Sequence, residues 1–203
     1  EAAGWEFSGT AVAYYQTHDG LGELDLFDAE SSLGNFGVQL RATNSDLFAG
    51  IGAGVEVNGL TELPWVADYY MQNPTSDADN SGGWLSQAYL TYGFGNTSFK
   101  VGRQTLPKAL SPFAFSENWN VFANTFDAAL VVNTDITDTT LVYAFVNRAN
   151  FNSSGFLGLI PMNDFNNPFF DEGAHMFTVQ NKSIANLTLT GTYYNVQDAG
   201  VDS

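Results

Sequence analysis

The stretch "LFAGIGAGVEV", residues 47–57, alternates strictly between two kinds of side chain. Its odd-numbered positions are all aliphatic, whereas its even-numbered positions hold three glycines together with Phe48 and Glu56. A period of two places the two sets on opposite faces of a β-strand and forms no stripe along a helix. The stretch "FGVQLRAT", residues 36–43, alternates in the same way. The two stretches therefore predict neighbouring strands joined by a short turn at "NSD", residues 44–46.

The same alternation recurs along the chain and predicts nine strands and no helix. Their predicted bounds are residues 5–16, 35–43, 47–57, 84–93, 97–106, 124–133, 139–148, 174–182 and 186–196. Strands of soluble sandwiches have about 5 to 6 residues, whereas a tilted strand that crosses a bilayer needs about 9 to 11. Most of the predicted strands have the second length, which indicates an all-β protein that crosses a membrane with strands.

The connections between these strands alternate between long and short. The short ones are predicted at residues 44–46, 94–96, 134–138 and 183–185. Outer-membrane barrels place short turns at the periplasmic end and long loops at the external end. The pattern therefore predicts an antiparallel up-and-down transmembrane β-barrel in a bacterial outer membrane, in contact with outer-membrane lipid and lipopolysaccharide.

Composition excludes several classes of function. The 203 residues include no cysteine, two histidines, 22 acidic and six basic side chains, with a net charge of −16. Six cations are too few to neutralise a nucleic-acid backbone, so nucleic-acid binding is excluded. No run of about 18 apolar residues predicts a transmembrane helix. No nucleophile motif accompanies either histidine, so we expect no enzymatic activity. Most acids lie in the long connections, which favours passage of cations.

The third long connection follows the fifth predicted strand, and its stretch "LPKALSPFAF", residues 106–115, is unusually apolar for a surface loop. The sequence around it is "SFKVGRQTLPKALSPFAFSENWNVFANTFDAALV", residues 98–131. It resembles the trimeric major outer-membrane porins of Campylobacter-type bacteria. The resemblance implies a barrel of about 16 to 18 strands that passes small hydrophilic solutes by diffusion. It further implies a homotrimer, bound calcium in some members, and residues 107–123 as a loop that folds into the barrel and narrows it.

The resemblance and the alternation together indicate candidate pore residues. The candidate constriction residues are Lys108, Ser111, Glu117, Asn118, Asn120 and Asp127. The candidate pore-wall cations are Arg41, Lys100, Arg103, Arg148 and Lys182. Arg103 is an exception, because alternation from Val101 would point it at lipid. We therefore expect either a bulge at Gly102 or a position near the membrane rim, where the side chain reaches polar surroundings.

Nine strands are about half of such a barrel, and single-chain bacterial barrels have an even number of strands. We therefore expect residues 1–203 to be the N-terminal half of one barrel domain. In "SDADNSGG", Asp77, Asp79 and Ser81 have the spacing of the first half of a calcium loop, although the later glutamate is missing. Two alternatives to a porin stay open: a non-conducting barrel that acts as an adhesin or anchor, and a soluble secreted β-sandwich that binds carbohydrate.

Overall fold

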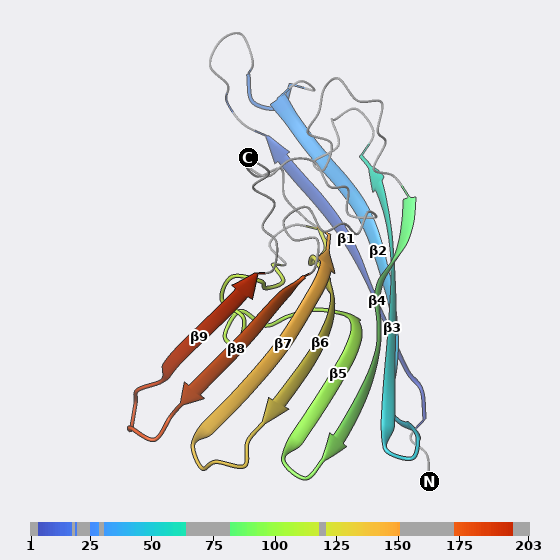
Figure 1. Cartoon of the computed structure of the whole chain (residues 1–203). Coiled ribbons are helices and arrows are strands. Elements are labelled where there is room, and N and C mark those ends of the chain that lie inside the picture. The colour runs from blue at the N-terminus through green and yellow to red at the C-terminus, as the bar shows by residue number, and fades with distance from the viewer. Residues whose placement is uncertain are drawn as a thin grey trace, which may run out of the picture.

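The chain forms one antiparallel sheet of nine strands in the order β1 to β9 (Figure 1). The computed structural model describes residues 4–17, 19, 25–28, 31–63, 82–117, 121–150 and 173–196. The strands are β1 (Glu6–Thr17), β2 (Ser32–Phe48), β3 (Ile51–Glu62), β4 (Gly82–Phe94), β5 (Thr97–Gln104), β6 (Phe126–Asn133), β7 (Thr139–Ala149), β8 (Ala174–Asn181) and β9 (Leu189–Val196). None of the described segments forms a helix that could span a bilayer. The predicted all-β, up-and-down architecture is confirmed.

Each strand pairs with its neighbours in the sequence, and the connections alternate in length as predicted. The four short connections lie together at one end of the sheet, at the bottom of Figure 1. They are residues 49–50, 95–96, 134–138 and 182–188. The long connections, at the other end, are residues 18–31, 63–81, 105–125 and 150–173. We call these two ends the short-turn end and the long-connection end.

The first short turn does not lie at residues 44–46, where the sequence predicted it. Strand β2 continues to Phe48, and the turn is made by Ala49 and Gly50, whose φ angles are 52° and 80°. Two positive φ angles in succession match the right-handed twist of a hairpin. The predicted turn residues instead form a register shift between Asn44 and Phe48. There the Asn44 side chain accepts a hydrogen bond from the backbone N–H of Asp46 at 2.9 Å, so local side-chain bonds support a bulge rather than a turn.

The two faces of the sheet differ in chemistry. In β3, the side chains of Ile51, Val55 and Val57 are 36%, 42% and 43% exposed, whereas those of Glu56 and Asn58, at alternating positions, are buried. Cross-strand pairing carries these two faces across the whole sheet. We call the face of exposed apolar side chains the outer face and the opposite one the inner face. An apolar surface on this scale is unfavourable in water and suits contact with lipid.

The long connection between β5 and β6, residues 105–125, lies against the inner face. Leu110 in its first half packs on a cluster of Val142, Ala144 and Met176 from β7 and β8. Phe122 in its second half packs on Leu60 and Trp84 from β3 and β4. We call these residues the 105–125 segment. It contacts both the β7–β9 side and the β1–β4 side of the curved sheet shown in Figure 1.

Candidate functional site

The first half of the 105–125 segment is fixed to β8 and β9. The hydroxyl of Thr178 donates a hydrogen bond to the Leu110 carbonyl oxygen at 2.9 Å. The backbone N–H of Phe113 donates to the Tyr194 hydroxyl at 3.1 Å, and the rings of Phe113 and Tyr194 meet edge to face with centroids 5.3 Å apart. Residues about 70 to 80 positions further along the chain therefore hold this half against the inner face.

The second half of the 105–125 segment is held in place by close packing of side chains. Phe122 is 4% exposed, and its ring lies 6.0 Å from that of Trp84 at an angle of 72°. It also lies over Gly37 on β2, where a Cβ would be only 2.6 Å from Cζ of Phe122. The absence of a side chain at residue 37 therefore creates the space that the ring fills.

Of the predicted constriction residues, three lie within the described part of this segment. Lys108 is exposed, with Nζ 4.4 Å from the centroid of the Phe115 ring. Ser111 is buried and donates to the carbonyl oxygen of Ala114, so it supports the turn rather than facing the lumen. The backbone N–H of Glu117 donates to the Asn124 side chain at 2.8 Å. Asn118 and Asn120 lie outside the described residues.

A polar network centred on Glu56 lies on the inner face of β2, β3 and β4. The Glu56 carboxylate is 3% exposed and accepts hydrogen bonds from Arg41 Nε at 2.7 Å and from Gln87 at 2.9 Å. Ser86 donates to its second oxygen. Arg41 remains 45% exposed, so its guanidinium is held by a buried acid and still meets the lumen side of the sheet. The structure thus places Arg41 on the inner face, and its role at a pore wall stays a prediction.

Lys100 lies beside this network on β5. Its ammonium group is 3.8 Å from the centroid of the Tyr89 ring, within the range of a cation–π contact. The Tyr89 ring in turn covers Gly54, the cross-strand partner of Tyr89, leaving no room for a side chain there. Arg41 and Lys100 thus both lie on the inner face. Arg41 is held by hydrogen bonds to Glu56, and Lys100 by the cation–π contact with Tyr89.

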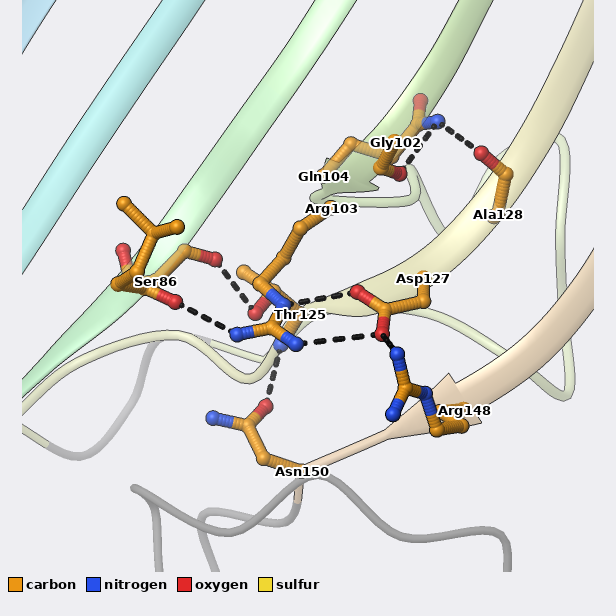
Figure 2. Close-up of polar contacts among 10 residues, drawn as sticks. Ser86, Gly102, Arg103, Gln104, Thr125, Asp127, Ala128, Arg148 and Asn150 are labelled. Atoms are coloured by element: carbon orange, nitrogen blue, oxygen red, sulfur yellow. Dashed lines mark hydrogen bonds and ion pairs between the residues drawn. The ribbon is translucent and has the colours of Figure 1, made fainter.

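Arg103, Asp127 and Arg148 lie on the outer face, at the long-connection end. Arg103 pairs with Ala88 and with Asp127, and Ala88 pairs with the exposed Val55, so the register places this row away from the lumen. Asp127 binds both arginines, with Arg103 Nε at 2.7 Å and an Arg148 guanidinium nitrogen at 2.9 Å (Figure 2). These residues do not occupy the pore-wall and constriction positions that the sequence analysis expected.

The expected bulge at Gly102 is wrong, because pairing continues through it without a shift on both sides. Gly102 has a φ of 121°. The register shifts lie instead in the flanking pairs β3–β4 and β6–β7. Arg103 is the second-last residue of β5, and its position near the membrane rim stays a prediction.

Arg103 also closes an interruption in the sheet. Strand β5 ends at Gln104, which leaves the carbonyl groups of Leu85 and Ser86 on β4 without a partner strand on that side. Arg103 Nη1 donates to the Leu85 oxygen at 2.9 Å, and the Thr125 hydroxyl donates to the Ser86 oxygen at 2.8 Å (Figure 2). Unpaired backbone groups in a membrane wall are costly, so these bonds stabilise the point where the 105–125 segment leaves it.

The remaining predictions have mixed outcomes. Lys182 is exposed in the connection 182–188 at the short-turn end and not on a strand, because β8 ends at Asn181. The candidate calcium residues Asp77, Asp79 and Ser81 lie outside the described residues. Within the described ranges, no three acidic or histidine side chains converge as metal ligands would. The sequence analysis did not select Glu56, Tyr89, Phe122 or Tyr194, which support the inner face and the segment.

Comparison with known proteins assigns the fold. No family model and no curated protein matches the chain. Several solved structures, however, match the chain. Pseudomonas aeruginosa OccK9 (OpdG) aligns with a TM-score of 0.66 and 16% identity over 98% of this chain and 51% of that one. Acinetobacter baumannii OccAB3 aligns with a TM-score of 0.66 and 12% identity over 96% and 50%. The fold is that of outer-membrane β-barrel porins.

A further match is the outer membrane protein OpdK from Pseudomonas aeruginosa, with a TM-score of 0.64 and 13% identity over 98% of this chain and 49% of that one. The chain thus spans about half the length of these solved structures. At such identities the similarity establishes the fold, in which the inner face of the sheet lines the barrel.

Proposed function

We propose that this chain forms part of the wall of an outer-membrane porin, through which small hydrophilic solutes and ions diffuse passively. The observation that carries the proposal is the 105–125 segment, which leaves the wall after β5 and packs on apolar clusters of the inner face. A segment in that place narrows a water-filled barrel without closing it. The outer face, with Leu40 56% and Val101 55% exposed, supports insertion in lipid and argues against a soluble sandwich.

Closure of the barrel requires further strands. In an antiparallel sheet of nine strands, β1 and β9 run in the same direction. An antiparallel barrel can therefore close only with an odd number of additional strands between them. A second copy of the nine-stranded sheet in the same orientation would meet β9 with a parallel β1. We infer that strands from the rest of a longer chain complete the wall, in keeping with the predicted N-terminal half of a barrel.

The finer predictions rest on the resemblance to Campylobacter-type porins, which is specific over residues 97–128. Under this proposal the protein is a homotrimer, and a calcium ion at Asp77, Asp79 and Ser81 stays a prediction. The matched solved structures are porins, which supports a channel and not a catalyst. Selectivity for cations is proposed from the acidic long connections, and the cations Arg41 and Lys100 on the inner face oppose it.

The test is single-channel recording of the full-length protein in a planar bilayer with a salt gradient. Stepwise conductance is the expected result, with steps that close in threes if the protein is a trimer. The sign of the reversal potential measures the preference between cations and anions. A protein that is demonstrably inserted and yet silent would overturn the porin proposal and favour a non-conducting anchor or adhesin.

A further inference from the structure

We propose that Arg148, held by Asp127 beside Arg103, forms a binding site on the outer face of the barrel for the phosphate of a lipid headgroup. This inference rests on the proposed location in an outer membrane and goes beyond transport. It concerns the side of the wall that solutes do not reach.

The first observation is the distribution of charge on the outer face. From mid-sheet to the long-connection end, Arg103, Asp127 and Arg148 are the only aspartate, glutamate, lysine or arginine residues at described outer-face strand positions. Their neighbours along the same strands are apolar, such as Val101 and Phe145. Charged side chains on a lipid-facing surface are unfavourable except close to the membrane interface. Asp127 binds both arginines, so the cluster keeps one net positive charge, which favours a position close to that interface.

The second observation is the position of the cluster along the strands. Arg103 is the second-last residue of β5, and Arg148 is the second-last residue of β7. Both strands end at the long-connection end. In outer-membrane barrels this end faces the exterior, so the cluster lies at the level of the external headgroups.

The third observation separates the two arginines. Arg103 is 19% exposed and is occupied by Asp127 and the Leu85 carbonyl, so it stabilises the wall. Arg148 is 51% exposed and contacts Asp127 through a guanidinium nitrogen. In the described structure Arg148 does not contact the Leu85 or Ser86 carbonyl groups of β4, which Arg103 and Thr125 bind. Its other N–H groups can therefore bind a ligand (Figure 2).

The chemistry of the cluster favours phosphate. Two guanidinium groups and one carboxylate leave one net positive charge, and a guanidinium matches two oxygens of a phosphate with parallel hydrogen bonds. Asp127 fixes the orientation of Arg148, which lowers the cost of ordering it on binding. The apolar surface next to the cluster, including Val101 at 55% exposure, suits acyl chains and so favours a lipid over free phosphate.

The experiment uses the full-length protein in phosphatidylcholine nanodiscs that contain a small fraction of bisphosphorylated lipid A. The amount of lipid A retained with the protein is measured by native mass spectrometry, in parallel with lipid A stripped of its phosphates. We expect the phosphorylated form to be enriched. Arg148→Gln should reduce that enrichment about fivefold, the effect of one basic residue near an anionic surface. Arg148→Lys keeps the positive charge but loses the guanidinium group that can make two parallel hydrogen bonds to a phosphate, so it should give an intermediate enrichment.

The matched control is Lys182→Gln, which removes an exposed cation at the short-turn end and should leave the enrichment unchanged. Equal enrichment in the wild type and Arg148→Gln would overturn the inference. So would displacement of lipid A by millimolar inorganic phosphate, because the site would then bind a free anion. If the wild type conducts but shows no enrichment, only this inference fails. If the protein does not insert into nanodiscs or bilayers, the proposed function fails with it.

Discussion

The ring of Phe122 occupies the space that a side chain on Gly37 would need. A Cβ at residue 37 would lie 2.6 Å from Cζ of Phe122 and 2.9 Å from a methyl carbon of Val121. Gly37 belongs to β2, and Phe122 belongs to the 105–125 segment. A missing side chain on the wall therefore determines where the second half of the segment rests, which links the packing of the inner face to the width of the lumen.

Replacing Gly37 with alanine should displace Phe122 from the wall. The added methyl group overlaps a ring that is already confined by Leu60 and Trp84, so the segment must shift. We expect the free energy of unfolding to fall by about 1 to 3 kcal/mol, the usual cost of overpacking. We also expect the single-channel conductance to change, because the displaced segment lies in the lumen. Urea unfolding in micelles and planar-bilayer recording measure the two effects.

The control for this variant is Gly93→Ala on β4, where a Cβ would meet nothing within 4 Å. It tests whether the loss of a strand glycine as such affects stability or conductance. Identical behaviour of the two variants would show that the contact between residues 37 and 122 does not position the segment.

Replacing Tyr194 with phenylalanine should loosen the first half of the segment. The variant keeps the edge-to-face contact with Phe113 but loses the hydroxyl that accepts the Phe113 N–H at 3.1 Å. The expected loss of stability is about 1 kcal/mol. The open-channel current noise should rise, because the segment then moves more. Tyr193→Phe, on the outer face of the same strand and 64% exposed, is the control and should leave the noise unchanged.

Sequence periodicity predicted the architecture because it is a local property. The alternation in residues 47–57 sorts side chains between two faces whatever the neighbouring strands are, and the structure has the same two faces. The position of the first turn, by contrast, is not determined by the local sequence alone. "NSD" has good turn residues, but the pairing of Phe48 with Ile51 placed the turn at Ala49 and Gly50. Hydrogen bonds within the strand pair outweighed the turn preference of three residues.

The supports of the candidate site depend on contacts between distant residues, which the sequence analysis could not assign. Phe122 meets Gly37, and Phe113 meets Tyr194, through a register that only the folded sheet defines. Glu56 did carry a signal, because it is the one acidic residue on the glycine-rich face of residues 47–57. Strict alternation also placed the Arg103 side chain on the outer face, where the structure has it. A bulge at Gly102 would have turned that side chain to the inner face, and this expectation was wrong.

Replacing Glu56 with glutamine should shift selectivity toward anions. The change removes the negative charge that Arg41 contacts, while Ser86 and Gln87 keep a polar partner. Because Arg41 is 45% exposed, water can solvate it, and the expected loss of stability is about 1 kcal/mol or less. The reversal potential in a salt gradient should move in the direction of anion permeation. Asp138→Asn, in the connection 134–138, should leave it unchanged; an equal shift in both variants would contradict a role for the inner wall.

We expect Asp135 to make the short turn between β6 and β7 sensitive to acid. Its side-chain oxygens accept hydrogen bonds from Asn133 at 2.6 Å and Asn96 at 3.1 Å. These bonds, first that from Asn133 and then that from Asn96, hold the pKa of the Asp135 carboxyl below its ordinary value. A lowered pKa in the folded state stabilises the protein above the ordinary pKa of aspartate, about 4, and this contribution is lost as the pH falls through the folded value.

Asn133→Ala should therefore raise the titration midpoint of Asp135 toward its ordinary value, as read from the carboxyl carbon signal by NMR in micelles. Asn96→Ala should raise it less, because its hydrogen bond to Asp135 is the longer of the two. A midpoint that is the same in the wild type and in both variants would mean that neither amide stabilises the ionised carboxylate. The order of the three midpoints thus tests the assigned cause of the shift independently of any change in overall stability.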